Sequence, residues 1–368
     1  MKSGWNEILE CSRANEVFLL WEWIDSWWSV FRNPDRELFI LAAVNDQGET
    51  IGFAPFYRET VRLMGIRCGQ ILKLCGDPET YPDHMDLFCR EPWEEEFVKA
   101  VFRYLQANEQ AWDCIDLNGL SDSSILRDFL PPGGAGGNGW RWHWRDDSVC
   151  PFLNTAGNFG GYLESFSAKK RYTLLKKRRI LGHTADFHVR DLTSPHEIEK
   201  YYDTLVSLHV ARAERKGIRS TFSEEKAASF HKRLIEALMK KDKVVLTLLF
   251  HGDTPLAAYY CYRHNRKYYF YQSGISKEGE GHSAGLVLLS RMIESCFQEG
   301  HLEFDFLRGA EEYKNYWTKT SRKNLALGIR RGGCGGNWTS IIYDWQKKAP
   351  LAGERIMRIL KPGRAGTG

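Results

Sequence analysis

The segment from residue 268 to residue 285 has the arrangement best suited to bind a ligand. Tyr268 to Gly274 predicts a strand, and a glycine-containing loop leads from it into a helix. The first turn of a helix carries unpaired backbone N–H groups at the positive end of the helix dipole, which favours phosphate binding. The residues that would supply these amides are Gly281, Ser283, Ala284 and Gly285. The glycines either let an anion approach the backbone or serve only to turn the chain.

Two other segments gather positive charge. The run Lys169–Arg179 has seven basic residues and no acidic one, so on a helix the charges would cover most of the circumference. It is either a solvated face or a surface for a polyanion, such as a coenzyme phosphate, an anionic glycan, a lipid-linked precursor or RNA. His209, Arg212 and Arg215 recur at three-residue steps on one helical face. They could line an acceptor cleft or form surface ion pairs.

The hydrophobic pattern predicts the elements that would position these residues. Apolar runs at 244–250, 256–263 and 267–273 are separated by short turns, which is typical of an antiparallel meander. We expect a loop at 275–284, then a helix at 285–299, a strand at 302–307 and a short helix at 311–317. The order of helix, hairpin, helix and strand occurs in both halves of the chain and could reflect a duplication.

The first half opens with an amphipathic, tryptophan-rich run at 18–31 that predicts a helix. Its apolar face either packs on a sheet or binds a partner or a membrane. The sheet would begin with strands at 38–44 and 51–57 and continue at 69–75, 85–88 and 113–118, with a helix at 93–108. The proline- and glycine-rich stretch 131–139 predicts an exposed loop.

Composition limits the class of protein. The chain has 368 residues, of which 43% are hydrophobic and 27% are charged, and this excludes a disordered or collagenous protein. Such a length predicts two domains, which we place at 1–150 and 151–368. The second would include a C-terminal helix at 341–360 and a tail at 361–368.

No membrane span and no signal peptide are evident, so we expect a cytoplasmic protein. The nine cysteines form no CxxC pair and no zinc-type cluster, which predicts reduced thiols and no bound metal. The formal net charge of +4 does not by itself imply nucleic-acid binding.

Three stretches together resemble a known family: YYFYQSG, HSAGLVLLSRMIESCFQEG and FDFLRGAEEYKNYW. They look like the signature of the CelD-like (BioF2-like, cellulose biosynthesis) acetyltransferase-domain proteins. These belong to the GCN5-related N-acetyltransferase (GNAT) superfamily. The similarity extends to LHVARAERKG at 208–217, to the basic run and, more loosely, to the first half. The family commonly has Ser-Pro-Gly where this chain has Ser283-Ala284-Gly285, and alanine adds an N–H donor. The Gln/Arg-x-x-Gly-x-Gly/Ala loop of the wider superfamily is absent.

The resemblance implies an α/β (α+β) fold of two tandem GNAT-like domains, each a mixed, mostly antiparallel sheet flanked by helices. It also implies that an acyl-coenzyme A, acetyl-CoA or another, lies between two diverging strands and transfers its acyl group to an amine or hydroxyl. The first domain would be degenerate. The residues expected at the cofactor are Gly281, Ser283, Ala284, Gly285, Gln272 and Arg308, and those expected at the acceptor are His209, Arg212 and Lys314.

Four further residues are candidates for the chemistry that the resemblance implies. A protonated amine must lose a proton before it attacks, and Asp305 and Glu311 are candidate bases. The departing thiolate benefits from a proton donor, for which Tyr313 and Tyr271 are candidates. For each of them a purely structural role stays open, including an ion pair between Asp305 and Arg308.

Three functions follow as alternatives. The first is an acyl-CoA-dependent acyltransferase that acts on a saccharide or a cell-envelope or exopolysaccharide precursor. The second is a FemAB-like aminoacyltransferase, which transfers amino acids from charged tRNA to cell-wall precursors. The third is a non-catalytic accessory protein of the polysaccharide-synthesis machinery.

Overall fold

The computed structural model describes residues 2–131, 139–184, 186–218, 220–331 and 339–347. The elements of the first half are α1 (Lys2–Glu10), the 3-10 helix η1 (Val17–Leu19), α2 (Trp21–Phe31), β1 (Arg36–Val44), β2 (Thr50–Leu63), β3 (Ile66–Leu74), β4 (Phe88–Cys89), α3 (Glu94–Ala107), the 3-10 helix η2 (Glu109–Ala111), β5 (Cys114–Ser121), α4 (Ile125–Phe129) and β6 (Arg141–Asn154). Those of the second half are α5 (Phe159–Glu164), α6 (Ala168–His183), β7 (Phe187–Leu192), α7 (Pro195–Arg215), α8 (Glu225–Met239), β8 (Val244–His251), β9 (Thr254–His264), β10 (Lys267–Ile275), α9 (Lys277–Gly281), α10 (Ala284–Gln298), β11 (Glu303–Asp305), α11 (Lys314–Trp317) and β12 (Ser321–Arg330). Residues 339–347 are also helical.

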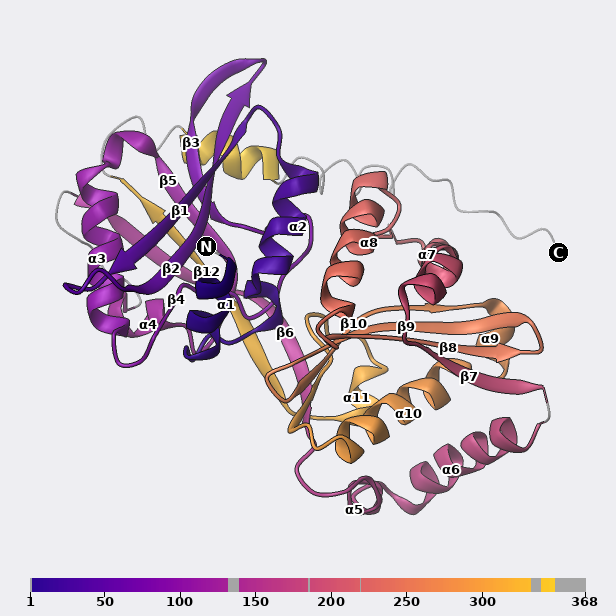
Figure 1. Ribbon diagram of the computed structural model, residues 1–368. Coiled ribbons are helices and arrows are strands. Elements are labelled where there is room, and N and C mark those ends of the chain that lie inside the picture. Colours follow the sequence, from indigo (N-terminus) through magenta and orange to yellow (C-terminus); the bar gives the residue numbers. More distant parts are fainter. Residues whose placement is uncertain (1, 132–138, 185, 219, 332–338, 348–368) are drawn as a thin grey trace.

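One mixed, mostly antiparallel sheet runs through both halves of the molecule (Figure 1). The strand order is β1-β2-β3-β5-β12-β6-β11-β10-β9-β8-β7, and β4 pairs separately with β2. In the second half α7 and α8 cover one face of the sheet, and α10 covers the other (Figure 1). The predicted α/β fold class is confirmed.

The two halves of the sheet repeat one plan. Each half contains three consecutive antiparallel strands, β1-β2-β3 or β8-β9-β10, and a helix, α3 or α10, comes later in the chain than the third strand. In the second half β7 adds a further antiparallel strand beside β8. The fourth strand, β5 or β11, then pairs in parallel with the third. The fifth strand is exchanged: β12, from the second half, pairs with β5, whereas β6, from the first half, pairs with β11. The boundary expected at residue 150 falls within β6.

The tryptophan-rich helix is part of the core. Trp23 and Trp27 of α2 are fully buried. The ring of Trp23 lies 5.4 Å from that of Phe230 on α8 and 5.4 Å from that of Tyr262 on β9. α2 therefore joins the hydrophobic cores of the two halves, and its apolar face serves packing, one of the two roles predicted for it.

The structure differs from the predicted elements at two places that matter for the site. The long strand β6 was not predicted, although it carries the contact between the halves. The loop expected at 275–284 contains the short helix α9, whose first turn is capped by Ser276. The predicted loop at 131–139 lies largely outside the described residues, as do residues 348–360 of the predicted C-terminal helix and the tail. The described cysteines are free thiols, and most of them are buried. Among the described helices, none combines the length and the apolar character needed to cross a membrane.

A buried histidine makes folding sensitive to pH. His231 on α8 is 2% exposed and lies among aromatic rings, and its Nδ1 has no hydrogen-bond partner among the described residues. Burial lowers the pKa of His231 to about 3. The unfolded chain binds a proton at this histidine below about pH 6.5, whereas the folded chain does not. This contribution to stability is therefore present above pH 6.5 and is lost progressively as the pH falls towards 3.

We expect His231→Phe to reduce the pH dependence of stability. Between pH 4.5 and 6, the slope of the free energy of unfolding against pH should fall by about 1.4 kcal/mol per pH unit relative to the wild type. Urea unfolding at several pH values measures it. The exposed His196 provides the control, because His196→Gln should leave the slope unchanged. An unaltered slope in His231→Phe would show that His231 is protonated in the folded protein.

Candidate functional site

The candidate site lies where β10 and β11 separate. The two parallel strands pair only from Lys267 with Glu303 to Tyr269 with Asp305. Directly beyond this point is a cavity of about 320 Å³. One wall comes from β10, another from the segment after β11, and a third from α7. The cavity is lined by Tyr81, Asp83, His209, Arg212, Ala213, Lys216, Ile218, Thr221, Phe270, Tyr271, Gln272, Ser273, Phe306, Leu307, Arg308, Glu311, Tyr313 and Lys314.

Most of the site residues predicted from the sequence meet in this cavity. Those that line it are His209, Arg212, Tyr271, Gln272, Arg308, Glu311, Tyr313 and Lys314. Asp305 lies behind the wall, and the group at 281–285 lies outside the cavity. Tyr81, Asp83 and Lys216 also line the cavity and were not among the residues predicted from the sequence. Tyr81 and Asp83 come from a loop of the first half, and no local pattern indicated that this loop reaches a site in the second half.

His209 orients the side chain of Gln272. The Nε2 atom of His209 lies 2.7 Å from Oε1 of Gln272, and its Nδ1 lies 2.8 Å from the hydroxyl of Ser220. Because an amide oxygen can only accept, Nε2 carries the proton and donates it to Gln272. Burial lowers the pKa of His209, so the ring is neutral at pH 7. The NH₂ group of Gln272 remains as a donor at the cavity.

Two cations give the cavity a positive wall. The guanidinium of Arg212 donates to the hydroxyl of Ser273 at 2.6 Å and forms no ion pair with any described residue. Lys216, the C-cap residue directly after α7, also has no ion-pair partner within the described ranges. Burial and the charge of Arg212 lower the pKa of Lys216. Neighbouring cations without counter-ions favour an anionic ligand.

The two tyrosines differ in availability. Tyr271 donates its hydroxyl hydrogen to the carbonyl of Thr80 at 2.8 Å, so this proton is already in use. The hydroxyl of Tyr313 has no partner in the described part of the chain. Burial raises the pKa of Tyr313 above its ordinary value, which keeps the hydroxyl protonated at neutral pH. Tyr313 is therefore the tyrosine that can donate a hydrogen bond or a proton in the cavity.

Lys314 holds the segment that carries Glu311. Its buried ammonium group donates to the carbonyls of Leu307, Arg308 and Gly309 at 2.7 to 3.2 Å. It also pairs with Glu311 at 2.9 Å. These contacts occupy the ammonium donors, so Lys314 shapes the cavity wall from within the protein. Gly309 has a φ of +112°, and a Cβ there would collide with the carboxylate of Glu311.

Asp305 is an internal anion that joins the halves. It is fully buried and lies 2.8 Å from Nε2 of His84, in the first half, and 2.9 Å from Arg322 of β12. Burial opposes its ionisation, but the charges of His84 and Arg322 outweigh that effect and lower the pKa of Asp305 to about 2. Asp305 thus stays a carboxylate at neutral pH.

Arg308 does not pair with Asp305, the partner that the sequence had suggested. Its Nε donates to Asp83 at 2.7 Å, and its backbone N–H donates to the same carboxylate at 3.0 Å. A further donor reaches the carbonyl of Pro82 at 2.8 Å. Arg308 and Tyr81 also line a second cavity of about 780 Å³, which extends into the first half. The two cavities are therefore neighbours.

The start of α10 is partly filled by protein. Ala284 is fully buried, and a Cβ at Gly285 would collide with the side chain of Ile275. Position 285 must therefore be a glycine, because any side chain there would prevent α10 from packing against β10. The backbone N–H groups of His282 and Ser283 already bond to carbonyls of α9. Open space surrounds the Cβ position of Gly281. Ser283 adopts a left-handed conformation with a φ of +58°.

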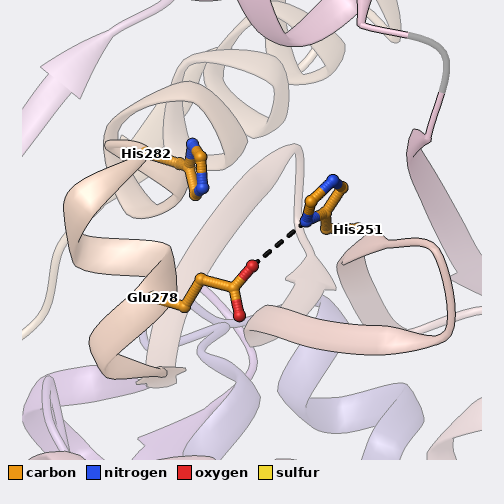
Figure 2. Close-up of side chains that lie close together, drawn as sticks. All are labelled: His251, Glu278 and His282. Carbon is orange, nitrogen blue, oxygen red and sulfur yellow. Dashed lines mark hydrogen bonds and ion pairs between the residues drawn. The ribbon is translucent and has the colours of Figure 1, made fainter.

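The outer side of α9 carries three potential metal ligands. Figure 2 shows His251, the last residue of β8, facing Glu278 of α9, with His282 at the end of that helix. His251 and Glu278 are 3.1 Å apart, and the ligand atoms of all three residues lie within 4.8 Å of one another. Histidine and glutamate are donor types that zinc accepts. The hydrogen bond between His251 and Glu278 also fixes α9 to the hairpin.

We expect Asp305→Asn to destabilise the protein, because it leaves buried His84 without its paired counter-charge, whereas Arg322 keeps Glu303 as a partner. The free energy of unfolding at pH 7, measured in urea, should fall by about 3 kcal/mol or more. The control is Glu95→Gln, which breaks the exposed pair between Glu95 and Lys99 and should cost less than about 1 kcal/mol. Wild-type stability combined with lost activity in Asp305→Asn would assign Asp305 to the chemistry instead.

Comparison with known proteins places this geometry in context. Residues 168–315 match the family model described as "Acetyltransferase (GNAT) domain". A search of curated proteins found no match to this sequence. FemX has a similar structure, with a TM-score of 0.62 at 10% identity over 89% of this chain and 95% of that chain.

Two further solved structures have TM-scores of 0.52. One is the C-terminal domain (DUF2156) of a putative lysylphosphatidylglycerol synthetase from Agrobacterium fabrum, with 10% identity over 100% of this chain and 98% of that chain. The other is a conserved protein of unknown function from Bacteroides thetaiotaomicron, with 11% identity over 90% of this chain and 98% of that chain. Identities this low are evidence of shared fold alone. The chain therefore contains a GNAT-like acetyltransferase domain within a larger α/β fold.

Proposed function

We propose that the protein is an acyltransferase that transfers an acyl group from a coenzyme A thioester to an amine or hydroxyl in the cavity at β10 and β11. The observation that carries this proposal is the position of the cavity. It lies where two parallel strands of the GNAT-like domain stop pairing, and its walls bear an oriented amide, a protonated tyrosine, a carboxylate and two cations that form no ion pair with a described residue. These are the groups that acyl transfer requires.

The residues present fit an acyl thioester whose other end is anionic. Beyond Tyr269 the edge of β10 has no partner strand, so a slender chain could lie beside it. Arg212 and Lys216 would attract phosphate groups, whereas the start of α10 offers open space mainly at Gly281. When bound, the thioester supplies a carbonyl carbon that is already activated for attack.

The side chains of the cavity would then have separate roles in the transfer reaction. The NH₂ of Gln272 would donate to the carbonyl oxygen as negative charge develops there. Glu311, directly or through a water molecule, would accept the proton of the attacking amine or hydroxyl. A C–N or C–O bond forms as the C–S bond breaks, and Tyr313 would protonate the departing sulfur. In this proposal Asp305, Lys314 and Arg308 position the walls and do not touch the reacting atoms.

The proposed acceptor is a saccharide or a cell-envelope or exopolysaccharide precursor. Its support is the resemblance to the CelD-like, cellulose-biosynthesis type of acetyltransferase, together with the polar second cavity beside the first. That cavity has room for the part of a large acceptor that does not react. Arg308 and Tyr81, which line both cavities, would contact such a molecule at its middle.

Calorimetric titration with acetyl-CoA and with free coenzyme A tests the donor. We expect saturable binding by the wild type and about 10- to 100-fold weaker binding by Arg212→Ala, because a hydrogen-bonded charge is lost. Gly281→Asp, which adds a carboxylate at an open position of the predicted phosphate loop, should also weaken binding. Lys232→Ala, on the exposed surface of α8, is the matched control and should bind normally.

Lack of binding by the folded wild type would contradict coenzyme A as the donor. Aminoacyl-tRNA would then be titrated, because the FemAB-like alternative uses that donor. Equal binding of coenzyme A by the wild type and by Arg212→Ala would show that the guanidinium of Arg212 does not bind the donor.

We expect Tyr313→Phe to lower kcat about 100-fold and to change KM less than about threefold, because the hydroxyl acts on the leaving group and not in binding. Initial rates of coenzyme A release, with amino sugars as acceptors, measure both constants. Tyr104→Phe, at an exposed position of α3, should retain wild-type kinetics. A Tyr313→Phe enzyme with unchanged kcat would exclude this tyrosine as the proton donor.

A further inference from the structure

The basic run of the sequence forms α6, a helix on the outside of the second half (Figure 1). Its inner side is fixed by a few contacts. Leu174 and Leu181 are buried, and the ammonium group of Lys170 lies 3.4 Å from the centre of the Phe166 ring. Arg178 pairs with Glu294 and donates to Ser290 of α10 at 3.2 Å. These contacts hold α6 in place and leave its other side to solvent.

The outer side carries a dense positive charge. Lys169, Arg171, Lys176, Lys177 and Arg179 form no ion pair with any residue that the structure describes. The helix itself contains no acidic residue. A solvated surface helix normally mixes both signs of charge, because oppositely charged neighbours stabilise it. The unmixed charge of α6 therefore costs self-repulsion that an anionic partner would relieve.

Large apolar side chains interrupt these charges. Tyr172, Leu175 and Ile180 are 63%, 45% and 51% exposed. With about 100° of rotation per residue, they share an arc of about 140° with Lys169, Lys176 and Arg179. We call these six residues the outer face of α6. It combines exposed hydrophobic groups and cations on one surface, although the interior of the protein would have accommodated the hydrophobic groups at lower free energy.

We propose that the outer face of α6 binds the surface of an anionic lipid bilayer. Basic residues attract the negative headgroups, while aromatic and aliphatic side chains enter the boundary with the acyl chains. Both components of the face are then used. RNA would also attract the cations and could stack on Tyr172, but it offers nothing to Leu175 and Ile180. The apolar pair therefore favours the bilayer over nucleic acid.

The inference does not depend on the proposed acyl transfer. α6 lies outside both cavities, and binding to a bilayer is measured without any substrate. The link between the two is structural: Lys170 of α6 donates to the carbonyl of Tyr316 on α11, the helix that follows Tyr313. α6 therefore stands between the proposed bilayer surface and the segment that carries the candidate proton donor.

Co-sedimentation of the whole protein with vesicles tests the proposal. One probe is vesicles of phosphatidylcholine alone, and the other is strongly anionic vesicles that contain about 30% phosphatidylglycerol. Both are used at about 0.1 M salt. We expect binding to the anionic vesicles only. Lys176→Ser/Arg179→Ser should weaken it about 30-fold, since each basic residue near such a surface contributes about fivefold. Leu175→Ser/Ile180→Ser should weaken it about tenfold or more.

Matched controls separate this face from general attraction to charge. Lys226→Ser/Lys232→Ser removes two exposed cations from α8 and should leave vesicle binding within about twofold. Circular dichroism checks that each variant is folded. Equal loss in the α6 and α8 charge variants would overturn the proposal, and so would full binding by Leu175→Ser/Ile180→Ser. Tight RNA binding without vesicle binding would overturn it in favour of a nucleic-acid surface.

Discussion

The ion pairs that join the loop at 76–86 to β11 and to the segment after β11 are the constraint on which the rest of the structure depends. Asp305 meets His84 in the interior, and the partly exposed Arg308 meets buried Asp83, so two ion pairs join distant parts of the chain. A buried charge without its partner is costly, and therefore only one relative position of the halves is tolerated. That position brings Tyr81 and Asp83 to the cavity and makes its wall part of both halves.

The exchange of the fifth strands also fixes the position of the two halves relative to each other. β12 fills the place between β5 and β6, and β6 extends beyond it to pair with β11. Neither half can complete its own sheet from its own residues. The hydrophobic core follows this arrangement, since Trp23 of α2 packs against rings of the second half. The cavity thus lies at a junction that backbone hydrogen bonds, ion pairs and apolar packing all define, which suits a site that must hold reacting groups in fixed positions.

Local sequence patterns predicted the elements but not the way in which the halves combine. The meander at 244–273, α10 and the tryptophan-rich helix follow from hydrophobic spacing, which acts over a few residues. β6 was not predicted because charged residues and Pro151 interrupt its hydrophobic pattern, and because its partners β11 and β12 are far away in the sequence. The grouping of His209, Gln272, Arg308 and Tyr313 followed from a resemblance. The internal role of Asp305 and Lys314 did not. Asp305 meets His84 of a distant loop and Arg322 of β12, and Lys314 binds the carbonyls of a segment whose path no local pattern encodes.

The position of β12, far downstream of β5 and β6 in the sequence, has a consequence for synthesis. A ribosome releases the chain from its beginning, so β5 and β6 emerge long before the strand that lies between them. During that interval two strand edges of the first half expose unpaired backbone groups, which can pair with other chains. The nascent protein is therefore prone to aggregate until β12 has been synthesised and pairs with β5 and β6. A cell that makes this protein in quantity would benefit from chaperones that cover the gap.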